Sequence, residues 1–324
     1  MKKIVEVPEG ANTAFDEERE KIAVYQVLNE SLESATKSKK KFITCKVLGA
    51  KHNMNGSTPE YRVCAMCQYK DWIILVKADQ MGFNPKEFEG LNNQQKEAKY
   101  AKFISNMTFS TINVVIIGID VKTKRAAGNR NMAMEYIKDR YYFKSDSNGK
   151  SAMEKIFESK KEVFPQARVV TVSKSVVWLE VFGLLTDVYA RDVEWRFVEN
   201  LKSVISVGDL VPVKIMELTI DKENKKVKMR VSIKEAKENM MIRNMQYYNE
   251  GDTLAGTVSN IQNGACYVQI GDFKTGIDVL CKIINLDEVP NKKDIVLVTI
   301  GKKDNETGRV FGRIEEIRKR ASNY

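Results

Sequence analysis

The sequence predicts a mainly β chain of three small five-stranded barrels in tandem, with helical linkers between them and an N-terminal α-helical arm. One pattern recurs three times: an alternating apolar strand, an Asp-led turn and a second strand that opens on a basic residue. Its copies begin near residues 112, 207 and 294. Short alternating segments separated by turn residues accompany the copies, as in small barrels. A length of 324 residues suits about three modest domains.

The N-terminal region, residues 1–40, is predicted to form the helical arm. Residues 14–35 begin with acidic side chains, and Ile22, Tyr25, Val27 and Leu32 are their apolar positions. No barrel strand lies in this region, so we expect the arm to belong to none of the barrels. Residues 1–10 lack the long apolar stretch of a signal peptide.

The first barrel is predicted over residues 41–125 and is the most divergent copy. Its polar segment before the fourth strand is expected to be helix or loop. The strands are expected at residues 42–48, 61–69, 72–76 and from Ile112 onward, with the polar segment at 84–102.

Residues 126–160 are predicted to form a linker and hinge. The linker has helical spacing of its apolar residues over 131–143, and a polar, glycine-containing hinge follows at 145–151. The middle barrel, residues 161–235, is expected to hold three strands, a helical insert and a closing hairpin. These lie at residues 167–172, 176–181, 187–190, 191–201 and from Gly208 onward.

A helical linker over residues 236–248, extending back to Ile233, is predicted to lead into the last barrel at 249–324. Asn263 and Gly264 form a strong hairpin signal. The strand after them, 266–270, should place Val268 and Ile270 inward and Tyr267 outward; the next strand is expected at 277–283. Five short strands in a Greek-key barrel form an OB fold, so the chain is expected to hold three OB-type domains.

The last copy resembles the S-one domain, an RNA-binding domain repeated in the largest protein of the bacterial small ribosomal subunit. The middle copy shares Gly208, Asp209, Val213, Ile215 and residues 231–236 with this pattern, and the resemblance extends over roughly residues 40–320. In the last copy it is carried by Gly251, Asp252, Gly256, Val258, Tyr267, Val268, Gly276, Ile277, Val296, Val298, Asp304 and Arg309.

The resemblance implies that bases of single-stranded RNA stack on aromatic side chains of the second and third strands, with basic residues nearby. Independently of the family, an open curved sheet suits such stacking because every base has a π-face. The third strand departs from the family by carrying Val279 and Cys281 in place of its His and Ser. The candidate RNA-binding residues are Tyr267, Lys274, Arg313, Trp178, Tyr69, Trp72, Lys122, Lys124 and Arg125.

Charge and residue usage narrow the functional classes. The net charge is +10, and basic residues gather in the turns and linkers, which favours a polyanionic partner. His52 is the only histidine, so a His-based triad or a His-rich metal site is not expected. Asp120, Asp221 and Asp304 each begin a turn, where Asp is favoured for backbone reasons. No phosphate-binding or dinucleotide-binding glycine pattern is present.

The cysteines indicate a reducing compartment. The five are irregularly spaced, as in a cytoplasmic protein with free thiols. Cys64 and Cys67 lie three apart in a predicted strand and should face opposite sides, which argues against zinc. Cys266 and Cys281 are expected to be neighbours across two strands, as reduced core thiols. No apolar stretch is long enough to span a bilayer.

From these observations we expect a cytoplasmic, non-enzymatic protein without metal or cofactor. Its expected task is binding single-stranded RNA, linked to translation or the ribosome. The alternatives are a protein-docking adaptor, a single-stranded DNA-binding protein of a mobile element, and an accessory subunit of a nuclease.

Overall fold

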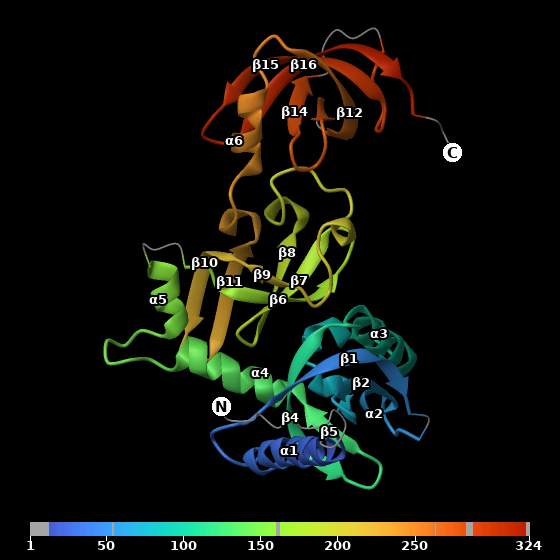
Figure 1. Ribbon diagram of the computed structural model, residues 1–324, viewed down its shortest axis with the longest axis vertical. Coiled ribbons are helices and arrows are strands. Elements are labelled where there is room, and N and C mark those ends of the chain that lie inside the picture. The colour runs from blue at the N-terminus through green and yellow to red at the C-terminus, as the bar shows by residue number, and fades with distance from the viewer. Residues whose placement is uncertain (1–12, 54, 160–162, 263, 283–287, 322–324) are drawn as a thin grey trace, which may run out of the picture.

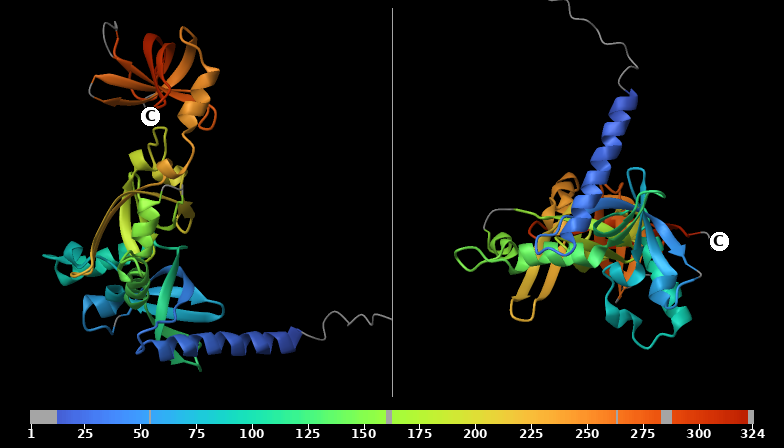
Figure 2. Two further views of the ribbon diagram at one scale, coloured as in Figure 1. Left: turned by 90° about the vertical axis from the view of Figure 1, so that its left-hand side faces the viewer. Right: turned by 90° about the horizontal axis from the view of Figure 1, so that it is seen from below.

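A computed structural model describes the chain except for residues 1–12, 54, 160–162, 263, 283–287 and 322–324 (Figure 1). The molecule is elongated and mainly β. A closed barrel near the N-terminus, a middle body and a second closed barrel follow one another along its long axis (Figure 2). We call these the first barrel, the middle body and the last barrel.

The first barrel has the strand order β1-β2-β3-β5-β4 and closes on itself. Its interior is made by alternating apolar residues, among them Val47, Ala65 and Ile74, all fully buried. The polar segment expected as helix or loop forms the helix α3 (Asn93–Asn106). The strands are β1 (Ile43–His52), β2 (Val63–Tyr69), β3 (Trp72–Lys77), β4 (Thr111–Asp120) and β5 (Arg125–Asn129).

The expectation that the arm belongs to no barrel is wrong. Helix α1 (Thr13–Ser34) packs on the first barrel through Val24 and Leu28, which are buried, while the predicted apolar positions Ile22 and Val27 are exposed. Ser31 Oγ accepts a hydrogen bond from the backbone N–H of Ile116 in β4 at 2.9 Å. A small hydroxyl residue therefore fixes the helix to the strand, and hydrophobic periodicity alone does not reveal such a contact.

The linker after the first barrel is helical, as predicted. Helix α4 (Arg130–Lys138) continues into a π-helical turn, η3 (Asp139–Phe143). The predicted hinge at residues 145–151 contains local pairing. Ser145 and Ser151 form an isolated β-bridge, and Ser151 Oγ caps the next helix, α5 (Ala152–Glu158), by accepting from Glu154 N at 3.2 Å.

The middle body is not the closed barrel that the sequence predicted. It holds one sheet with the order β8-β7-β6-β9 and a separate pair, β10-β11. Strand β9 ends at Pro212, which has no N–H to continue a ladder. A hydrogen bond of 3.2 Å from Thr186 Oγ1 to Met229 O bridges β8 and β11. The strands are β6 (Gln166–Val172), β7 (Val176–Val181), β8 (Leu184–Tyr189), β9 (Leu210–Pro212), β10 (Lys214–Asp221) and β11 (Lys226–Ser232).

Residues 191–201 do not form the expected helical insert. Between the short 3-10 turns η4 (Ala190–Asp192) and η5 (Leu201–Ser203), the chain is irregular and docks on the last barrel. Arg196 Nε donates to Asp278 Oδ1 at 2.9 Å, and Phe197 N donates to Asp278 Oδ2 at 2.8 Å. The segment predicted as a helical insert is thus an inter-domain loop.

The last barrel repeats the order of the first, β12-β13-β14-β16-β15, and is closed. The linker before it holds only short helical pieces: η6 (Lys234–Ala236), α6 (Met240–Asn244) and η7 (Met245–Tyr247). Of the predicted strand positions, Asn263 and Ile283 lie outside the described residues. The strands are β12 (Thr253–Gln262), β13 (Ala265–Ile270), β14 (Ile277–Lys282), β15 (Ile295–Asp304) and β16 (Arg309–Lys319).

The repeated pattern corresponds to the hairpins β4-β5, β10-β11 and β15-β16. The leading carboxylates, Asp120, Asp221 and Asp304, accept hydrogen bonds within their own turns, as predicted, and these bonds lower their pKa. The residue four positions after each Asp has a positive φ: 51° at Lys124, 50° at Lys225 and 73° at Gly308. One turn geometry therefore explains the recurrence.

Candidate nucleic-acid interface

Three outward side chains form a row across adjacent strands of the last barrel. Tyr267 in β13 is paired with Leu280 in β14, and Leu280 is paired with Phe311 in β16. Val268 and Ile270 are buried, so Tyr267 faces outward as predicted. Phe311 is 37% exposed, and Tyr267 is half-buried. Two ring side chains with an aliphatic residue between them thus lie on one outer surface.

Basic residues lie beside this row. Lys282 is two residues from Leu280 on β14, and Arg309 and Arg313 are each two residues from Phe311 on β16, so all three share its face. Arg313 is paired with Glu315 at 3.0 Å. Lys282 and Arg309 make no ion pair with any residue that the structure describes. We call these six residues (Tyr267, Leu280, Phe311, Lys282, Arg309 and Arg313) the aromatic face.

One end of the aromatic face is closed by the middle body. Gln269 and Asp278 are the outward residues of the next register pair, and both bind the loop that contains Arg196 and Phe197. Gln269 Nε2 donates to Phe197 O at 3.1 Å. Asp278 is thereby paired with a guanidinium, so the positive charge at the open end is not offset by this carboxylate.

Lys274 and Arg313 were both predicted to lie near Tyr267. Arg313 does lie on the same face. Lys274 is exposed on the β13-β14 loop, beyond the strand end that the middle body covers, and its carbonyl accepts from Asn244 Nδ2 at 2.8 Å. The structure therefore does not bring Lys274 into the row.

The aromatic candidates of the first barrel are placed differently. Trp72 is only 4% exposed and stacks with Tyr25 of α1, with ring centroids 6.4 Å apart. Tyr69, its partner in the β2-β3 hairpin, is half-buried against the core. Trp72 is covered because the alternation of β3 turns it inward with Ile74 and Val76, and Tyr25 of α1 stacks on it.

The basic candidates of the first barrel, Lys122, Lys124 and Arg125, are exposed on the β4-β5 turn. Lys124 Nζ is hydrogen-bonded to Asp71 and lowers the pKa of that carboxyl. Lys122 and Arg125 make no ion pair with a described residue. The three form a basic turn without an exposed aromatic row beside it.

Trp178, the candidate of the middle body, is 38% exposed. Its ring lines a cavity of about 350 Å³, together with Phe83 and Phe103 of the first barrel and Leu185 of β8. This tryptophan therefore lies at a domain junction rather than on an open sheet face.

Phe311 and Lys282 were missed as site residues. The signal for Phe311 was present, because the alternation of β16 places Val310 inward and Phe311 between two outward arginines. Its neighbour Gly312 faces inward, where an added Cβ would lie 2.6 Å from Val279 Cγ1. The pairing of β16 with β14, which joins Phe311 to Tyr267, is a long-range contact that the sequence does not display.

The prediction that Cys266 and Cys281 are neighbours in the core of the last barrel is confirmed. Cys266 and Cys281 are paired across β13 and β14, and both are buried and free. Burial raises their pKa to about 11 and about 12. Cys67 is buried and Cys64 is not, as expected for opposite faces of a strand.

Within the described part of the chain, no three His, Cys, Asp or Glu side chains are grouped in a way that could hold a metal ion. None of the helices described there combines the length and the apolar composition needed to cross a bilayer.

No known family model matches this chain. A multidomain protein with nucleic acid binding domains from Streptococcus pneumoniae is 10% identical, with a TM-score of 0.20, over 85% of this chain and 73% of that one. Drosophila Unr CSD456 is 9% identical, with a TM-score of 0.17, over 86% and 98%. The p202 HIN1 domain in complex with 12-mer dsDNA is 13% identical, with a TM-score of 0.16, over 49% and 94%. Likeness at these TM-scores carries no argument about this chain.

Proposed function

We propose that the chain binds single-stranded RNA, and that the aromatic face of the last barrel is its main contact. The observation that carries this proposal is the row of Tyr267, Leu280 and Phe311 with Lys282 and Arg309 beside it. Flat rings stack with bases of any sequence, and basic residues near them contact the phosphates. A net charge of +10 adds a general attraction for a polyanion.

Single strands fit this surface better than a duplex does. Stacking on a side chain needs the flat side of a base, which a duplex keeps inside its own stack, whereas an unpaired strand exposes it. RNA is preferred over DNA here because of the resemblance to the S-one domain, since either strand offers bases and phosphates. Single-stranded DNA therefore belongs in the same test.

The experiment is a titration of the full chain with labelled single-stranded RNA, single-stranded DNA and duplex, at several salt concentrations. We expect single strands to bind best, with a log–log salt slope of about −0.7 for each neutralised phosphate. Tyr267→Ala and Phe311→Ala should each weaken RNA binding by about 1–3 kcal/mol. Tyr247→Ala is the matched control, because Tyr247 is 71% exposed and lies in η7, outside the aromatic face.

Two outcomes would contradict RNA binding at this face. A salt-independent or undetectable interaction at low salt would remove the RNA proposal and favour a protein-docking adaptor. Equal losses in Tyr247→Ala and Tyr267→Ala would show that the aromatic row has no special role. Tighter binding to single-stranded DNA would favour the mobile-element alternative.

The wider role that we propose is non-enzymatic and linked to translation or the ribosome in the cytoplasm. The resemblance to the S-one domain supports it, and so does the elongated arrangement of three bodies, which offers a long surface to an extended strand (Figure 2). Ribosome co-sedimentation of the tagged full chain, with and without prior RNase treatment, tests this role.

A further inference from the structure

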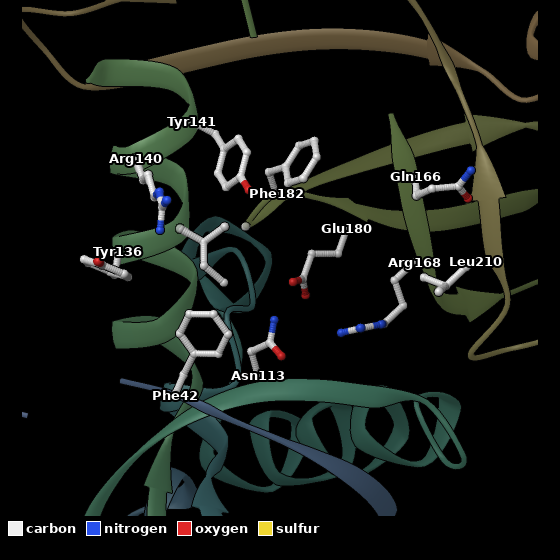
Figure 3. A pocket seen from close by; sticks show the side chains of 12 residues that line it. Phe42, Asn113, Tyr136, Arg140, Tyr141, Gln166, Arg168, Glu180, Phe182 and Leu210 are labelled. Atoms are coloured by element: carbon white, nitrogen blue, oxygen red, sulfur yellow. The ribbon is translucent and has the colours of Figure 1, made fainter. Parts of the chain in front are cut away.

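A second cavity lies between the first barrel, the linker helix and the middle body. Its volume is about 270 Å³. The side chains that line it come from the start of the first barrel, from β4, from α4 and η3, and from β6 and β7 (Figure 3). It is remote from the aromatic face, because it lies at the opposite end of the middle body from the last barrel (Figure 1).

The cavity contains an arginine without a partner. Arg168 in β6 is paired in register with Glu180 in β7, but the carboxylate of Glu180 is bound by Arg130 at 2.5 Å. The Nε atom of Arg168 is buried and has no hydrogen-bond partner among the described residues. Figure 3 shows the Arg168 guanidinium pointing into the cavity. A buried donor without a partner is costly, and the terminal nitrogens of the same guanidinium make no hydrogen bond to a described residue, so the group is suited to an acceptor in the cavity.

A second guanidinium approaches from the other side. Arg140 in η3 extends toward the cavity in Figure 3 and makes no ion pair with a described residue. The three positive charges of Arg130, Arg140 and Arg168 exceed the one negative charge of Glu180. Planar guanidinium groups bind phosphate oxygens well because they can donate two parallel hydrogen bonds.

Aromatic and amide groups complete the lining. Phe42, 39% exposed, lies at the bottom of the view in Figure 3, and Tyr136 lines the cavity from α4. Tyr141 and Phe182 stack on each other at 4.1 Å and form another wall. Asn113 and Gln166 bring amide groups to the lining. The site thus combines flat apolar surface, cationic donors and neutral polar groups.

We propose that this cavity is a nucleotide-binding site, in which Arg140 and Arg168 hold the phosphate and Phe42 and Tyr136 contact the base. Glu180 then accepts a hydrogen bond from a ribose hydroxyl or a base amino group, which inorganic phosphate does not offer. Small-molecule pockets commonly measure about 300–1,000 Å³. The cavity, at about 270 Å³, lies just below this range, so a ligand no larger than one nucleotide suits it.

The nucleotide has two sources with the same chemistry: a free mononucleotide, or one unit of a single strand. The test is calorimetric titration of the full chain with ribonucleoside monophosphates, with a short single-stranded oligouridylate and with inorganic phosphate. Arg168→Met keeps the apolar stem and removes the charge; it should weaken nucleotide binding by roughly tenfold or more. Phe42→Ala should weaken it by a smaller factor. Arg191→Met, an exposed arginine of the same body, is the control and should change little.

Each titration either supports or contradicts the proposed nucleotide site. Mononucleotide binding that depends on Arg168 supports a free ligand. Oligouridylate binding that depends on Arg168 in the Tyr267→Ala, Phe311→Ala background, without mononucleotide binding, supports a strand unit. Independence from Arg168 in both arms overturns the proposal, as does inorganic phosphate binding as tightly as nucleotide. Urea unfolding of Arg168→Met shows whether a loss is local, and if the variant is unfolded, Arg140→Met at the exposed side of the cavity replaces it.

These results are separable from RNA binding at the last barrel. Failure of the cavity leaves the effects of Tyr267→Ala intact, and failure of the aromatic face leaves the dependence on Arg168 intact.

Discussion

The first and last barrels share one strand order and one pattern of inward residues, but they differ on one outer face. Gly128 of the first barrel and Gly312 of the last hold equivalent places: each faces inward on the strand that runs parallel to the third strand of its barrel, where a Cβ would meet buried side chains within 3 Å. Counting from these glycines, the row of Tyr267, Leu280 and Phe311 corresponds to Met66, Leu75 and Ala127.

The two barrels differ at two outward positions and agree in character at inward ones. The central residue is leucine in both rows, and inward positions stay small or apolar because the interior is closely packed. The two flanking outward positions carry rings in one barrel and Met and Ala in the other. Outward positions face no packing constraint of this kind, so they can differ between copies without cost to the frame. The aromatic face is therefore a property of the last barrel and not of the fold.

The largest difference between the two barrels is expected at Trp72, the ring that the first barrel buries. Trp72→Ala should destabilise the chain by about 3–5 kcal/mol, the usual cost of removing a buried Trp, and leave RNA affinity unchanged under folding conditions. Tyr267→Ala should do the reverse, with a stability change of about 1 kcal/mol or less. Urea unfolding and an RNA titration of both variants check this. Lost RNA affinity in a stable Trp72→Ala protein would show that both barrels bind through rings.

The aromatic row can be transferred to the first barrel by substitution. In the Tyr267→Ala, Phe311→Ala background, Met66→Tyr with Ala127→Phe should restore RNA affinity by about 1 kcal/mol or more, the lower end of one stack. Met66→Leu with Ala127→Val is the control, because it adds apolar area without a ring. Equal gains in the graft and the control would mean that apolar area, and not stacking, is what the face supplies.

A third comparison concerns the pH dependence of the buried thiols in the two barrels. Burial raises the pKa of Cys266 and Cys281 above 9, so their folded thiols keep a proton that the unfolded chain releases. This contribution to stability is complete below about pH 9 and declines as pH rises toward 11–12, by at most about 1.4 kcal/mol per pH unit for each thiol. Cys281→Val should show a shallower decline between pH 8.5 and 10.5 in urea unfolding.

The first barrel provides the internal control for this effect. A hydrogen bond with Cys45, together with burial, raises the pKa of Cys67, so that barrel should keep its own pH dependence in the Cys281→Val variant. Identical slopes in the two proteins would show that Cys281 does not keep its proton in the folded state.

Much of the fold is predictable because its signals are local. The alternation of β13, the three Asp-led turns and the pairing of Cys266 with Cys281 all depend on neighbours in sequence or on one hairpin. The predicted helix at 191–201 failed for the opposite reason. Arg196 there is 5% exposed because it binds Asp278 of the next domain, and no local pattern reports such a partner.

The candidate site was predictable only in part. Tyr267 and Arg313 follow from alternation and from the resemblance, whereas the position of Phe311 beside Leu280 requires the parallel pairing of β14 with β16. Trp72 was misplaced for a local reason. Its strand was predicted correctly, but the alternation of β3 turns Trp72 inward with the buried Ile74 and Val76.

By itself, the sequence determined a basic, mainly β chain with three copies of one hairpin, because period-two alternation and Asp-led turns are set by residues close to one another. The tertiary structure decided which copies close into barrels, which side chains share one outer face and where Arg130 of α4 meets Glu180 of β7. These outcomes depend on pairings between strands far apart in sequence and on packing between the three bodies, which no local pattern reports.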